Sequence, residues 1–240
     1  MGWMYMNTDK EFQIMQLSDS FFPSGMFSMS GGLESLSQKK IITNWNQVHE
    51  FILEQIEFQL IPCDCNVLKI TMDVVKNNDI DGILSIDNKF YSMKLTKDLR
   101  NSLVRSGKQV FNCLMHMIDD SNQNNNFLKQ FKNKVETNET PCTYPVALGI
   151  YSQCLDISLS SAMKILLYSF SSSVASAAIR LGIIQHLDAQ KILGLLAEPV
   201  NIFVSKKILE KNNSDIWQLT PLTEIHQMYH EHNESRMFIT

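Results

Sequence analysis

Hydrophobic positions along this 240-residue chain recur mainly at the three- and four-residue spacing of an α-helix, not at the alternate positions of a β-strand. The clearest stripe follows Ser158, a residue type that favours helix starts. β-Branched residues form few clusters. The pattern predicts an all-α fold, a single-domain helical bundle of about ten helices that spans residues 1–240. The stripe consists of Leu159, Met163, Leu166, Phe170, Val174, Ala177 and Leu181.

Residues that cap helices precede several of the apolar stripes. A short helix is also predicted from Phe27 to Gln38, in spite of the glycines within it. Pro199 is expected to kink or divide the last long helix. The capping positions are Thr8, Asn44, Thr96, Ser158, Asp188 and Thr220.

Residues 119–140 are polar and rich in asparagine, and only residues 127–135 have the pattern of a short helix. We interpret this segment as a solvated connection within one domain.

The stretch from Gln16 to Leu36 differs from the helices around it, because large apolar residues are interleaved with serine, glycine and proline. Pro23 fixes φ and Gly25 permits a positive φ, so residues 22–25 are expected to form a turn. Two interpretations remain open. The stretch is either a buried connection whose phenylalanines fill the core, or an exposed turn that a partner covers.

Composition narrows the class of protein. With 25 acidic and 21 basic residues the net charge is −4, which gives no electrostatic reason to expect nucleic acid as a partner. The five cysteines lack the spacing of a disulfide scaffold and indicate reduced thiols in the cytoplasm. No run reaches the roughly eighteen apolar residues of a membrane span, and the first ten residues do not resemble a signal peptide.

No catalytic motif in the sequence is complete. Gly107-Lys108 is the only Gly-Lys pair, and it lacks the rest of a phosphate-binding loop. Ser161 and Lys164 match the S-x-x-K pattern of acylating hydrolases without the accompanying motifs, and such an enzyme would place Ser161 in a pocket. We therefore expect no catalytic residues, no bound cofactor and no enzymatic activity.

Two pairs of residues have the chemistry of metal ligands. His226 and His230 are four residues apart and would share a helix face, and Cys63 and Cys65 form a C-x-C pair. Neither pair alone is a complete site, so no metal site is predicted and the two histidines remain candidates. The alternative function that these pairs suggest is a small helical nickel-binding carrier that uses all four residues.

The stretch 16–36 resembles the amino-terminal signature of the UreF family of urease accessory proteins. Met29 departs from that signature, since the family usually has tyrosine there, which removes one phenol hydrogen bond. The matching residues are Leu17, Ser20, Pro23, Gly25, Phe27, Ser28, Ser30, Gly32, Leu33 and Glu34.

Two further segments extend this resemblance over nearly the whole chain. Residues 177–182, Ala-Ala-Ile-Arg-Leu-Gly, are similar to a family motif, and residues 220–240 resemble the family tail. Signatures in the right order near both ends of a chain are more specific than either alone. The matches in the tail are Pro221, Leu222, His230, Glu231, Arg236 and Phe238.

The resemblance implies a non-enzymatic urease maturation factor. Such a protein is an adaptor that binds the accessory protein UreD, called UreH in some systems, and recruits the GTPase UreG for nickel insertion into apo-urease. Nickel would be handled by the complex and not firmly bound by this chain. The resemblance assigns partner contact to Ser20, Pro23, Gly25, Phe27, Ser28, Ser30, Leu33, Glu34, Arg180, His230, Arg236 and Phe238.

A homodimer within the complex is also expected. The family behaves in this way, and residues 169–178 include a run of serine and alanine that would let a second helix come close. Packing of the same small residues inside the monomer is the alternative.

Overall fold

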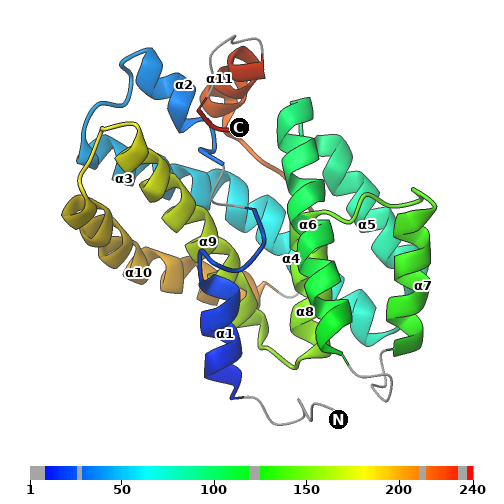
Figure 1. Ribbon diagram of the computed structural model, residues 1–240. Coiled ribbons are helices and arrows are strands. Elements are labelled where there is room, and N and C mark those ends of the chain that lie inside the picture. Colours follow the sequence, from blue (N-terminus) through cyan, green and yellow to red (C-terminus); the bar gives the residue numbers. More distant parts are fainter. Residues whose placement is uncertain (1–8, 26–28, 119–124, 211–214, 232–236, 240) are drawn as a thin grey trace.

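The computed structural model of the protein describes residues 9–25, 29–118, 125–210, 215–231 and 237–239. Within these ranges the chain forms eleven α-helices, one π-helical segment and no strand (Figure 1), so the predicted all-α fold is confirmed. The elements are α1 (Lys10–Ser18), α2 (Leu33–Gln38), α3 (Trp45–Gln55), η2 (Ile56–Asp64), α4 (Cys65–Lys76), α5 (Ile80–Met93), α6 (Lys97–Met117), α7 (Asn125–Glu136), α8 (Tyr144–Cys154), α9 (Leu159–Arg180), α10 (His186–Leu209) and α11 (Pro221–Glu231).

α8 lies at the centre of one half of the molecule, packed against α4 and α6 (Figure 1). Every residue from Tyr144 to Ser152 is buried, as is typical of a helix that is enclosed on all sides. Gly107 of α6 permits this packing, because a Cβ there would lie 2.0 Å from the carbonyl oxygen of Cys142. Any side chain at Gly107 would therefore push the start of α8 away.

Asp87 of α5 holds the segment that leads into α8. Its buried carboxylate accepts hydrogen bonds from the backbone N–H groups of Cys142 and Thr143 at 2.7 and 3.0 Å. It also accepts from the hydroxyls of Thr140 and Thr143, both at 2.5 Å. Burial raises the pKa of Asp87, and these four donors oppose that rise.

α9 is the central helix of the other half and packs against α10, α1, α2 and α3. Its small residues Ser171, Ser173, Ala175 and Ala178 are buried inside the chain. The intramolecular alternative is therefore confirmed for these residues, and the homodimer stays a prediction that they no longer support. Among the described helices only α9 has the length and apolar composition of a membrane span, and 67% of its most apolar window is buried, as in a core helix.

Most predicted helix starts are confirmed. The side chains of Asn44, Thr96 and Ser158 each accept a hydrogen bond from the backbone N–H three residues further on. α1 is capped by Asp9, while the predicted cap Thr8 lies outside the described residues. The short helix expected near residues 127–135 is present as α7.

Two helical elements contain a proline in their interior. Pro199, which was expected to kink or divide its helix, lies inside α10, so the helix is not divided there. Pro62 lies inside η2, where π-helical turns join α3 directly to α4. The wider π-helical turn changes the hydrogen-bonding register, so a residue without an N–H is accommodated there.

The helix predicted for residues 27–38 is shorter than expected, since α2 begins at Leu33. Gly31 and Gly32 adopt left-handed φ values of 64° and 95°, which are incompatible with a right-handed helix. Residues 27 and 28 lie outside the described part of the chain.

Candidate functional site

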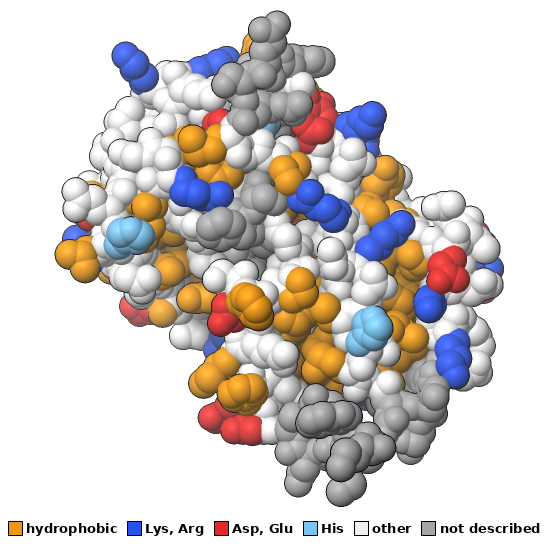
Figure 2. Space-filling view, in the orientation of Figure 1, with side chains coloured by type: hydrophobic (Ala, Val, Ile, Leu, Met, Phe, Trp, Pro, Cys, Tyr) orange, Lys and Arg blue, Asp and Glu red, His pale blue; other side chains and the backbone are white. Residues whose placement is uncertain are grey.

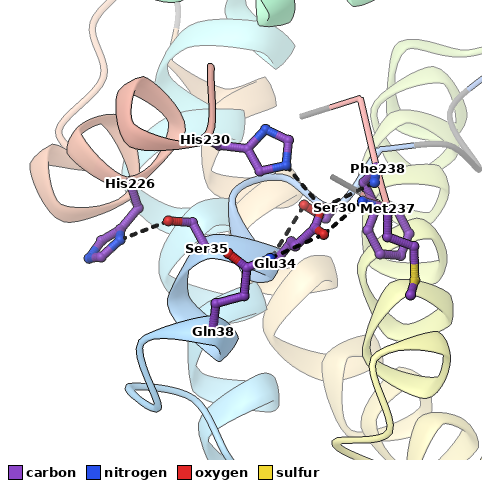
Figure 3. Close-up of polar contacts among 8 residues, drawn as sticks. All are labelled: Ser30, Glu34, Ser35, Gln38, His226, His230, Met237 and Phe238. Atoms are coloured by element: carbon purple, nitrogen blue, oxygen red, sulfur yellow. Dashed lines mark hydrogen bonds and ion pairs between the residues drawn. The ribbon is translucent and has the colours of Figure 1, made fainter. Parts of the chain in front are cut away.

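The buried carboxylate of Glu34, in the first turn of α2, joins the start of that helix to the tail after α11 (Figure 3). Its Oε2 accepts hydrogen bonds from Nε2 of His230 at 2.9 Å and from the backbone N–H of Phe238 at 3.1 Å. Its Oε1 accepts from the backbone N–H of Met237 at 2.8 Å and from the amide of Gln38 at 3.4 Å. These donors replace the water that the carboxylate loses on burial. We call this set of contacts the Glu34 junction.

The backbone that aims Glu34 inward is closely packed. A side chain at Gly31 would press on α9, and one at Gly32 would press on α11. Ser173 of α9 donates a hydrogen bond to the carbonyl oxygen of Met29 at 2.9 Å. Residues 29–34 are therefore held between α9 and α11.

Phe238 anchors the tail on the end of α9. Its side chain is 4% exposed, and the guanidinium of Arg180 lies 4.2 Å from the centre of its ring. A cation over an aromatic face is an attractive arrangement. Two residues that the resemblance assigned to partner contact thus contact each other.

α11 makes two further links to the helices beneath it. Nδ1 of His226 and the hydroxyl of Ser35 share a hydrogen bond of 3.2 Å, and the amide of Gln55 donates to the hydroxyl of Thr223 at 2.9 Å. Burial lowers the pKa of His226, and the nearby Lys39 ammonium lowers it further. These contacts favour a neutral His226.

The first half of the loop lies at the surface. Phe21 is 93% exposed, and Phe12 and Met15 of α1 are also exposed. With Pro23 and Met117 they border a cleft of about 560 Å³ between α1, residues 19–23 and the end of α6. Figure 2 shows hydrophobic side chains gathered on this part of the molecule. We call Phe12, Met15, Phe21 and Pro23 the loop surface.

A second apolar surface follows the outward side of α11. Leu222, Ile225 and Tyr229 of that helix are each about half exposed, and Leu219 just before it is 63% exposed. A groove of about 260 Å³ runs between α3, η2 and residues 219–223 and includes Phe58. We call these five residues the terminal-helix surface. The exposed carboxylates that also line the groove are those of Glu50 and Glu54.

The structure divides the twelve residues for which partner contact was predicted. Those at the surface of the described chain can meet a partner directly, while the buried ones already make their contacts within the chain. Partner contact itself stays a prediction for all twelve. The exposed residues are Ser20, Pro23, Gly25 and Arg180; the buried ones are Ser30, Leu33, Glu34, His230 and Phe238; Phe27, Ser28 and Arg236 lie outside the described residues.

The candidate metal ligands do not converge. His226 and His230 hydrogen-bond to two different side chains. Cys63 and Cys65 are fully buried, and burial raises the pKa of the Cys63 thiol to about 12 and that of Cys65 well above its usual value. The described residues contain no group of three or more histidine, cysteine, aspartate or glutamate side chains placed to hold a metal ion. This geometry does not favour the nickel-carrier alternative.

Ser161 and Lys164 do not have the geometry of a hydrolase. Ser161 lies in the first turn of α9, where its backbone N–H and its hydroxyl both contact the capping hydroxyl of Ser158. It is at the helix surface and does not line the groove that Lys164 borders. Its role is that of a helix-start residue.

Sequence reasoning did not assign a buried face to α1. Gln13 and Leu17 are the buried residues of this helix, while Phe12 and Met15 are exposed. An exposed apolar surface and a core face have the same periodicity, so the pattern alone does not separate them. Sequence reasoning also missed Gln55 and Thr223, which no motif distinguishes.

The described residues form an all-helical protein with two exposed apolar surfaces of the kind that marks interaction sites. The family model described as UreF matches residues 42–197. The chain belongs to the UreF family, as the terminal signatures indicated.

Relatives are similar along almost the entire chain. The urease accessory protein UreF of Trichodesmium erythraeum is 27% identical over 95% of this chain and 96% of its own length. The protein named urease accessory protein UreF 1 of Brucella melitensis is 29% identical over 94% of this chain and 91% of its own length. The UreF of Photorhabdus laumondii is 25% identical over 97% of this chain and 99% of its own length.

Proposed function

We propose that this protein is a non-enzymatic adaptor in urease maturation in the cytoplasm. It binds UreD or UreH and recruits the GTPase UreG, so that nickel is inserted into apo-urease by the complex. Membership of the UreF family and the names of its full-length relatives support urease maturation as the process. The adaptor acts as a homodimer within that complex.

The observation that carries the adaptor mechanism is the exposure of the loop surface. A phenylalanine that is 93% exposed leaves nearly its whole ring in water, and Phe12 and Met15 lie beside the same cleft. Grouped apolar side chains of this kind mark interaction sites, since covering them with a partner releases ordered water. The terminal-helix surface gives the chain a second site, as an adaptor with two partners needs.

The Glu34 junction supports both surfaces from inside. It ties residues 29–34, which follow the loop surface, to the tail that follows α11. A surface held in place before binding loses less conformational entropy when a partner docks. The buried signature residues therefore position the surfaces, while Pro23 and Gly25 face the partner.

Capture experiments with paired variants test this proposal. Phe21→Ser and Leu222→Ser each remove one exposed apolar group from a different surface, so the fold is retained. We expect each variant to weaken capture of a different protein, UreD/UreH or UreG, by about tenfold or more, as for interface anchor residues. Leu95→Ser, at an exposed leucine between α5 and α6, is the matched control and should capture both. Wild-type capture of both proteins by both variants would contradict the proposal.

A further inference from the structure

α10 has an outer face that nothing in the described chain covers. Leu187 is 83% exposed, Leu209 is 76% exposed, and Leu195 and Ile202 are each nearly half exposed. The opposite side of the helix, including Ile192 and Leu196, is buried against the core. Along this outer face the apolar residues recur at the seven- to eight-residue interval of a helix seam.

Gly194 lies in the middle of this face, and no contact with the described residues requires a glycine there. A Cβ built on it meets no atom within 4 Å, although glycine inside a helix is less stable than alanine. Glycine at such a position lets another helix come close. This distinguishes Gly194 from Gly107, whose contact is internal.

Two opposite charges flank the glycine on the same face. Lys191 and Glu198 are both exposed, and no ion pair within the described residues uses either of them. The ammonium of Lys191 lies 4.0 Å from the ring centre of Trp45, which places it at the edge of the face. Glu198 lies about two helical turns after Lys191.

The spacing of these residues is symmetrical. The midpoint between Leu187 and Ile202 is also the midpoint between Lys191 and Glu198, and it falls between Gly194 and Leu195. An antiparallel copy of the same face would therefore place leucine against isoleucine, lysine against glutamate, and glycine against leucine. Such self-complementarity is what a twofold contact between identical chains requires.

We propose that the outer face of α10 pairs with α10 of a second copy of this chain, antiparallel, about a twofold axis that passes beside Gly194. The partner is a second copy because the twofold axis places Lys191 of each copy opposite Glu198 of the other, which gives two pairs of opposite charges. This inference specifies the interface of the homodimer in the proposed function. It does not use the loop surface or the terminal-helix surface, so the capture experiments test the adaptor separately.

Charge exchange on the full chain tests the pairing. Lys191→Glu and Glu198→Lys each bring two pairs of like charges together, so each variant alone should dimerise about tenfold more weakly than the native chain. The variant with both changes restores the pairs and should recover. An equal mixture of the two single variants should form a heterodimer, because every facing pair is then opposite in sign. Sedimentation equilibrium at low salt measures dimer formation in the two single variants, the double variant and the mixture, each compared with the native chain.

Controls separate this interface from other faces. Leu187→Glu should weaken the dimer at least as strongly, whereas Leu95→Glu, at an exposed leucine outside α10, should not. Circular dichroism verifies that each variant is folded. A native chain that stays monomeric, or a dimer that Lys191→Glu and Leu187→Glu leave unchanged, would overturn the proposal. In the second case the homodimer would remain and its interface would lie elsewhere.

Discussion

Glu34 Oε2 and His230 Nε2 lie 2.9 Å apart, although 196 residues separate them in the chain. Both side chains are almost completely buried, 3% and 1% exposed. Helices α2 and α11, which are far apart in the chain, are thus joined by a polar contact in the interior. A buried carboxylate tolerates the loss of a donor poorly, since water cannot replace it.

Replacement of Glu34 by glutamine should release the tail. The variant keeps the volume of the side chain but offers one acceptor oxygen to the donors that Glu34 binds with two. We expect the free energy of unfolding to fall by about 2–4 kcal/mol, measured by urea denaturation, and cleavage after residue 231 to become faster in limited proteolysis. Glu54→Gln, at an exposed carboxylate, is the matched control. Equal stability of the two variants would show that the Glu34 junction contributes nothing.

His226 should give the protein a pH-dependent stability. Burial, and then Lys39, lower its pKa in the folded chain below the ordinary value of 6.5. The unfolded chain therefore binds a proton at higher pH than the folded chain, and the stabilising effect is fully present above pH 6.5 and lost as the pH falls through the folded value. Urea denaturation across this range should show a shallower decline for His226→Gln than for the native chain, and an unchanged one for exposed His186→Gln.

Loss of the Asp87 carboxylate should destabilise the start of α8. Asp87→Ala leaves two backbone N–H groups and two hydroxyls in the interior without their acceptor. We expect a loss of about 3 kcal/mol or more in the free energy of unfolding. Asp79→Ala, which removes only an exposed cap at the start of α5, should cost about 1 kcal/mol. A similar loss for both variants would contradict the role given to Asp87.

The two helical glycines at residues 107 and 194 should respond in opposite directions to the same change. Gly107→Ala places a Cβ at 2.0 Å from a backbone oxygen, so α6 and α8 must separate, at a cost of about 3 kcal/mol or more. Gly194→Ala meets no atom and should stabilise α10 by up to about 1 kcal/mol. Thermal unfolding of dilute samples compares them, and a Gly107→Ala variant as stable as the native chain would refute the close approach of α6 and α8.

The helical class and most helix starts could be predicted because they depend on local chemistry. A capping side chain such as Asn44 or Ser158 acts on a backbone group three residues away, and both act as expected. The start of α2 could not be placed, since the left-handed φ of Gly31 and Gly32 depends on their contacts with α9 and α11.

The signature residues were located from the sequence, but their surroundings were not. Spacing and residue type gave no sign that Glu34 would turn inward to meet backbone groups of Met237 and Phe238, because that contact depends on how distant helices pack. The sequence pattern also could not distinguish exposed Phe21 from buried Phe22, because the two residues are adjacent in one turn and both are apolar. Burial differs between the two halves of this stretch: residues 20–25 lie largely at the surface and residues 29–36 are buried. Cover of the exposed half by a partner stays a prediction.

The two backbone N–H groups that donate hydrogen bonds to Glu34 allow the Glu34 junction to be followed by hydrogen exchange. Met237 and Phe238 belong to no helix, and their N–H groups are held by this carboxylate. Their exchange with deuterium therefore follows the opening of this one contact, while amides of α8 and α9 exchange only when larger units unfold. A partner that binds the tail would therefore slow amide exchange at these two positions, even where the exchange rates of the rest of the protein stay unchanged.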